Sequence, residues 1–174
     1  VGEGTNSMAY SYDGINWMPV ASDVFANGYN TSIAWNGKMW ILGRTSAITV
    51  AYSMDGLSWF SAVYTDLASG VFGVACNSSR CVAVGWSGIF ADIEYSDDGI
   101  KWYSAEGAAD FVTNSEGVAW NGRMWVAVGN NATNNLVYSY DGKIWKNAKN
   151  TVANSSGNIA SAPAPNLYPA RTGI

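Results

Sequence analysis

Four aspartates recur along the chain in one local pattern, and paired carboxylates are the residue type that acid–base hydrolysis requires. Each stands in the sequence Ser-x-Asp-Gly-x-x-Trp, and successive copies begin 42, 43 and 43 residues apart. Catalysis needs unlike groups in an asymmetric arrangement, whereas a residue present in every repeat serves the repeat. The pattern therefore predicts turns in which Ser and Asp bond the local backbone, Gly supplies a positive φ and Trp covers the hairpin. The predicted turn residues are Ser11, Asp13, Gly14, Trp17, Ser53, Asp55, Gly56, Trp59, Ser96, Asp98, Gly99, Trp102, Ser139, Asp141, Gly142 and Trp145.

A second motif lies between these turns and completes the repeat. Ala-Trp-Asn-Gly-x-Met-Trp occurs at 34–40 and at 119–125, and the segment 75–81 is its counterpart with two cysteines. Asn-Gly and Asp-Gly between apolar runs are strong hairpin signals. The first full repeat thus predicts strands around 31–35, 39–43, 49–53 and 57–62. Four short antiparallel strands in each repeat of about 43 residues are typical of a β-propeller blade.

The turn motif resembles the Asp-box, or BNR repeat, of sialidase-type propellers. In that family the box joins the third and fourth strands of a blade, which agrees with its place here, although Gly directly after Asp is a departure from the commonest form. The second motif resembles that of uncharacterised tandem-repeat proteins of giant DNA viruses and bacteria. The Asp-box resemblance implies an all-β protein built of four-stranded antiparallel blades.

The repeats predict three full blades and a half blade over residues 1–148. Val1-Gly2 aligns with Val128-Gly129, the end of a second strand, so the first blade is expected to lack its first two strands. Residues 149–174 are expected to form a tail. Its segment 152–160 faintly resembles 24–34 and is a candidate ring-closing strand, followed by an extended Pro-rich arm. A partner subunit and a longer propeller are the alternative ways to complete the ring.

Composition excludes several classes of function. The 174 residues include 9 Lys+Arg, 13 Asp+Glu and no His, with a net charge of −4. This acidic balance argues against nucleic-acid binding. The absence of His removes sites that need imidazole, and we expect no metal and no cofactor. No apolar run reaches the ~18 residues that a membrane-spanning helix needs.

The two cysteines, Cys76 and Cys81, occupy the positions that hold tryptophans in the neighbouring repeats. A pair that changes together suggests contact across the hairpin, which favours a disulfide and an oxidising location. Two buried thiols are the alternative.

Ligand-binding residues are expected at the end of the blades opposite the repeated turns, where the segments vary. Arg44 and Trp86 occupy one variable position after the second strand, and Trp86 is the only Trp outside the repeated motifs. The loops between blades add Asp23, Asp66 and Asp110, with Tyr29 nearby. Packing against a neighbour is the alternative for Trp86, and turn formation is the alternative for the aspartates.

The sequence favours a non-catalytic binding or structural propeller that recognises a glycan or protein surface. It would be extracellular or part of a cell or virion surface, where other subunits of a larger assembly are possible partners. The alternative is a sialidase-like glycoside hydrolase. That family binds its substrate carboxylate with three arginines and uses a Tyr/Glu nucleophile pair with an acid Asp. Of four arginines here only Arg44 is expected at the variable end, so no catalytic residue is predicted.

Overall fold

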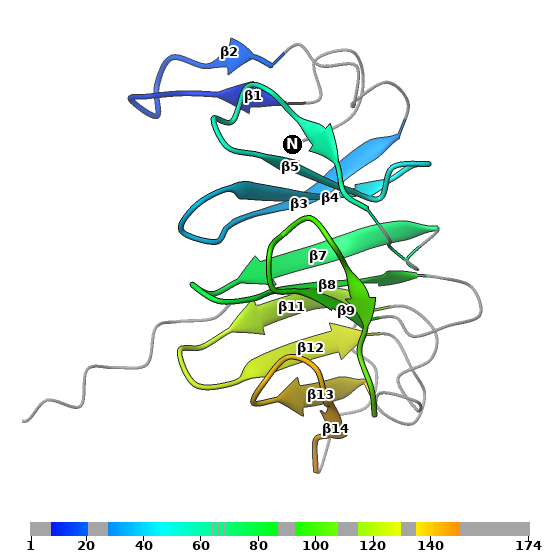
Figure 1. Cartoon of the computed structure of the whole chain (residues 1–174). Helices are drawn as coiled ribbons and strands as arrows, with labels where there is room; N and C mark the ends of the chain where they lie inside the picture. The colour runs from blue at the N-terminus through cyan, green and yellow to red at the C-terminus, as the bar shows by residue number, and fades with distance from the viewer. Residues whose placement is uncertain are drawn as a thin grey trace, which may run out of the picture.

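A computed structural model describes residues 8–20, 28–63, 65, 67, 69–86, 93–107, 115–129 and 135–149. Within these residues the chain forms one two-stranded and three four-stranded antiparallel sheets (Figure 1). The prediction of an all-β protein with four antiparallel strands in each repeat is confirmed. The tail predicted from residue 149 lies, apart from Lys149, outside the described residues.

Each sheet is one blade, and its strands are hydrogen-bonded in sequence order. Blade 1 shows two strands within the described residues, β1 (Ala9–Tyr10) and β2 (Met18–Pro19). Blade 2 holds β3 (Tyr29–Trp35), β4 (Trp40–Thr45), β5 (Val50–Ser53) and β6 (Phe60–Ser61). Blade 3 holds β7 (Gly70–Cys76), β8 (Cys81–Trp86), β9 (Ile93–Ser96) and β10 (Tyr103–Ser104). Blade 4 holds β11 (Ser115–Trp120), β12 (Trp125–Gly129), β13 (Leu136–Ser139) and β14 (Lys146–Asn147).

The first hairpin of each full blade is closed by an Asn side chain. The Oδ1 atom of Asn36 accepts hydrogen bonds from the backbone N–H groups of Lys38 and Met39, at 2.9 and 2.8 Å. Asn77 and Asn121 make equivalent bonds in blades 3 and 4. Because a side chain mimics a backbone turn here, four residues separate the paired strand ends.

This turn fixes which side chains face each other across the hairpin. Trp35 lies opposite Trp40, and their rings are 5.0 Å apart. The same register brings Cys76 opposite Cys81, and the two form a disulfide. A covalent link therefore takes the place of an aromatic pair in blade 3.

The first strand of each full blade also carries a bulge. The register shifts between Asn30 and Ser32, between Val71 and Gly73, and between Ser115 and Gly117. A bulge inserts one residue and lets pairing continue with a new orientation of side chains. β4 and β8 extend beyond the glycine of the repeat, to Thr45 and Trp86.

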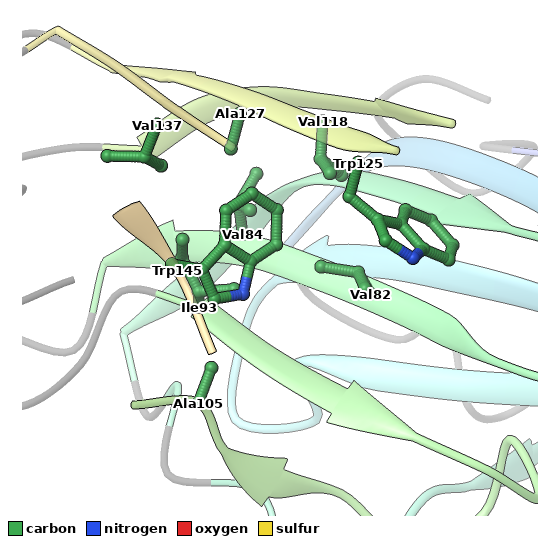
Figure 2. Packing of buried hydrophobic residues seen from close by; sticks show 9 residues of the cluster. All are labelled: Val82, Val84, Ile93, Ala105, Val118, Trp125, Ala127, Val137 and Trp145. Atoms are coloured by element: carbon green, nitrogen blue, oxygen red, sulfur yellow. The ribbon is translucent and has the colours of Figure 1, made fainter. Parts of the chain in front are cut away.

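Neighbouring blades are held together by the Trp that ends each Asp-Gly turn. Trp145 of blade 4 packs in one cluster with Val84 and Ile93 of blade 3 and with Val137 of its own blade (Figure 2). Trp102 of blade 3 packs in the same way against Ile41 of blade 2. The core of the molecule therefore lies between the sheets, and the Trp of blades 3 and 4 is buried against the preceding blade.

Exposure of this Trp follows the order of the blades. Its exposed fraction is 5% for Trp59, 1% for Trp102 and 1% for Trp145, but 63% for Trp17. Figure 1 shows blade 1 at the top of the row of blades and blade 4 at the bottom. Trp17 thus occupies the same motif position as the three buried tryptophans, but it is exposed because its blade lies at the end of the row.

No helix in the described part of the chain is long and apolar enough to cross a membrane.

These burials predict unequal effects of one substitution at equivalent positions. Trp145→Ala empties a buried site between two blades and is expected to lower the free energy of unfolding by about 3–5 kcal/mol. Trp17→Ala removes an exposed ring and is expected to cost less than ~1 kcal/mol. Urea unfolding at low protein concentration measures both. Equal losses would contradict the packing described here.

Candidate binding surface

The two kinds of turn lie at one end of the blades. A Cβ built on Gly99, in the Asp-Gly turn of blade 3, would lie 2.8 Å from Sδ of Met39 and 3.5 Å from Nδ2 of Asn36, in the Asn turn of blade 2. We call this the turn end. The opposite end, where β4 and β8 finish at Thr45 and Trp86 and β3 and β7 begin, is the loop end.

The aspartates that precede Gly in the four Asp-Gly turns are used by their own turns. Oδ1 of Asp13 accepts hydrogen bonds from the N–H groups of Ile15 and Asn16, both at 2.8 Å. The Ser of the motif adds a second bond, since Oγ of Ser11 accepts from the N–H of Gly14 at 2.9 Å. The other three turns repeat both bonds. These aspartates are therefore structural, and their bonding leaves them poorly suited to proton transfer.

The same bonds shift the pKa values of these carboxyl groups. The backbone N–H of Asn16, followed by its side-chain amide, holds the pKa of Asp13 well below its usual range. The backbone N–H groups of Ser58 and Leu57 do so for Asp55. At Asp98 and Asp141 burial acts in the opposite direction, yet hydrogen bonds from the backbone still leave the pKa lowered.

The loop end presents two exposed aromatic side chains from neighbouring blades. Trp86 is 47% exposed and Tyr29 is 53% exposed. Tyr29 pairs with Thr45 in blade 2, and Trp86 pairs with Gly70 in blade 3. A Cβ on Gly70 would lie 2.8 Å from Cγ2 of Thr45, so blades 2 and 3 meet where no side chain fits. Tyr29 and Trp86 therefore flank this close contact between the blades.

Arg44 does not share this exposure, which corrects its predicted place among surface residues. It is only 1% exposed, and its Nε donates a hydrogen bond to Oδ1 of Asn30 at 2.7 Å. The cause is the register: the segment from Trp40 to Gly43 is one residue shorter than the segment from Cys81 to Gly85. Arg44, opposite Asn30, therefore takes the place of the buried Gly85. The expectation that Arg44 and Trp86 share one position is wrong, because Thr45 is the counterpart of Trp86. A ligand on the outer surface would not contact the guanidinium directly.

The aspartates predicted for the loops, Asp23, Asp66 and Asp110, lie outside the described residues. They remain predictions.

A buried carboxylate that sequence reasoning did not single out supports this end. Glu94 is fully buried and accepts hydrogen bonds from the Thr65 hydroxyl at 2.9 Å and from the Leu67 N–H at 3.0 Å. The N–H of Ser69 then donates to the Trp86 carbonyl at 3.2 Å. Glu94 thus anchors the segment that leads to the partner strand of Trp86. The available signal was that Glu94 stands at a strand position that is apolar in the other blades, where Ala51 and Val137 occupy it.

A separate apolar groove of about 500 Å³ lies between blades 1 and 2. Its lining includes Tyr10, Trp17, Ile33, Trp40 and Trp59. Ile33 and Trp40 are exposed here, whereas their counterparts in blade 4, Val118 and Trp125, are buried. The groove lies where a full blade has its first two strands.

Two solved structures share this fold. No protein-family model and no curated protein matches the chain. A chain in the crystal structure of a nidogen/laminin complex aligns with a TM-score of 0.52 and 16% identity, over 74% of this chain and 51% of that one. A chain in the structure of YCF48 bound to a D1 peptide aligns with a TM-score of 0.54 and 16% identity, over 76% of this chain and 44% of that one. This chain therefore spans about half the length of the structures it resembles, and its architecture is that of a β-propeller.

The depressed pKa values predict acid sensitivity of the turns. Protons bind first to the unfolded chain, because the folded carboxyl groups have the lower pKa. The bonds to these ionised carboxyl groups therefore contribute their full stabilisation above about pH 5, and this contribution declines as the pH falls below ~4. The free energy of unfolding should fall over that range, and it should fall less steeply for the double variant Asp98→Asn/Asp141→Asn. Urea unfolding at a series of pH values measures both slopes; identical slopes would show that these turns do not contribute.

Proposed function

We propose that this chain is a non-catalytic binding module that recognises a partner protein through its loop end, with Trp86 as the central contact. The observation that carries the proposal is the exposure of Trp86 next to the junction of blades 2 and 3, with Tyr29 on the other side of the junction. Large aromatic side chains that are exposed and held by a rigid sheet are typical centres of binding energy.

The repeat itself supports a functional role for Trp86. In the register of the sheets Trp86 stands opposite Gly70 as Thr45 stands opposite Tyr29 in blade 2. Blade 2 fills the position with a small polar residue, so folding of a blade does not require Trp there. Trp86 ends a strand that is fixed by the sheet on both sides and by the segment that Glu94 anchors. A preorganised aromatic loses little conformational entropy when it binds.

The structures that share the fold also support a binding role. One is a nidogen/laminin complex and the other is YCF48 bound to a D1 peptide, so each of these structures contains a bound protein or peptide. At 16% identity the likeness extends to the fold.

We further propose an extracellular location or a place on a cell or virion surface, within a larger assembly. The disulfide between Cys76 and Cys81 supports this proposal, because such bonds persist in oxidising compartments.

Trp86→Ala tests the proposal directly. The variant is expected to lose binding by at least ~30-fold, the loss of about 2 kcal/mol that defines a central contact, without a lower melting temperature. Binding is measured by biolayer interferometry against candidate partner proteins and against a glycan array. Phe60→Ala, at a similarly exposed site on β6, is the matched control and should bind normally.

Three results would change the assignment. A lower melting temperature for Trp86→Ala would make Trp86 a packing residue. Binding confined to the glycan array would make the ligand a carbohydrate. Hydrolysis of aryl-glycosides that disappears when Asp23, Asp66 or Asp110 is replaced by Asn would replace the binding module with a sialidase-like hydrolase.

A further inference from the structure

Neighbouring blades are joined by one repeated backbone connection. The N–H of Val63, after the last strand of blade 2, donates to the carbonyl of Ile100 at 2.8 Å, and the N–H of Trp102 donates back at 3.4 Å. After blade 3, Glu106 makes the same pair of bonds with Lys143 and Trp145, at 2.8 and 2.9 Å. Both are isolated parallel bridges between a blade and the Asp-Gly turn of the next.

Side chains complete this connection. Cδ1 of Ile41 in blade 2 lies 2.8 Å from the Cβ position of Gly99, so the turn of blade 3 rests directly on β4. In blade 4 the Cβ position of Gly142 lies 3.1 Å from Cγ2 of Val82 in blade 3. Ile41 and Val82 are fully buried by these contacts.

One half of this connection is exposed at blade 1. Ile15 and Trp17 correspond to Ile100 and Trp102, and their exposed fractions are 82% and 63%. Among the described residues, no atom beyond its chain neighbours lies within 4 Å of the Cβ position of Gly14. We call residues 11–17 the docking turn.

The other half is exposed at blade 4. Lys149 stands four residues after Trp145, as Glu106 stands four residues after Trp102, and it is exposed. Val126 corresponds to Ile41 and Val82 but is only half-buried, and so is Met124 beside it. We call Met124, Val126 and Lys149 the docking face. It lies at the end of the row of blades opposite the docking turn (Figure 1).

We propose that a second copy of this chain binds head to tail, with its docking turn on the docking face of the first. Lys149 would pair with the backbone of Ile15 and Trp17, and Val126 would pack beneath Gly14 and Trp17. The molecule already forms this interface between its own blades, and a second copy would continue it at the end of the row. Because the two surfaces differ, the contact is heterologous, and it closes into a ring or extends into a chain of copies. It involves neither Trp86 nor Tyr29, so it is independent of the proposed binding function.

Sedimentation and light scattering test the self-association. The wild-type chain should have a mass of at least about twice 18.5 kDa at high concentration. Ile15→Glu alters the docking turn at an exposed side chain, and Val126→Glu alters the docking face. Each variant alone should be a monomer. Phe60→Glu, on β6 and away from both surfaces, should associate as the wild type does.

Mixing the two variants gives the decisive result. The mixture should associate again, because one intact docking turn still meets one intact docking face. If Val126→Glu does not fold, Lys149→Pro replaces it, since it removes the N–H that the connection needs. A wild-type monomer at all concentrations, or end variants that associate normally, would overturn the proposal. Failure of the mixture to associate would overturn the head-to-tail arrangement.

Discussion

The structure depends on the packing of one Trp between consecutive sheets. A four-stranded blade has two faces, and neither is buried by the blade itself. The Asp-Gly turn resolves this for one face, because its hydrogen bonds hold the turn in a shape that delivers Trp102 or Trp145 to the preceding blade. The Trp is thus close to its turn in the sequence, but it contacts residues of another blade. Loss of the turn geometry would therefore weaken the interface between blades as well as the hairpin.

The same arrangement separates structure from function along each strand. The turn end is occupied by residues that recur in each repeat, and their carboxylates are already bonded to the backbone. The loop end carries side chains that differ between blades, since Trp86 of blade 3 stands where blade 2 has Thr45. A binding surface at the loop end can change without disturbing the turns. This division is the physical basis for placing recognition at Trp86.

The sequence predicted the features that follow from short-range chemistry. Positions of the turns, the number of strands in each blade and the facing of Cys76 and Cys81 all follow from Asn and Asp side chains that bond a nearby backbone. The burial of Arg44 was not predicted, because aligning the glycines of the repeat matches Arg44 with Trp86, whereas the pairing of the strands matches it with the buried Gly85. Glu94 was missed for a related reason: its partners, Thr65 and Leu67, come from a segment nearly 30 residues away. Exposure of Trp17 likewise depends on which blades are neighbours.

The bridges at the edges of the blades couple each blade to the next, and amide hydrogen exchange measures this coupling. Glu106 is exposed and lies outside the regular sheets, yet its N–H donates to Lys143 and its carbonyl accepts from Trp145. We expect the amides of Glu106 and Trp145 to exchange as slowly as those of β12, because all of them would exchange only when the blades open as one unit. Exchange of these two amides at the rate of an exposed loop would contradict it.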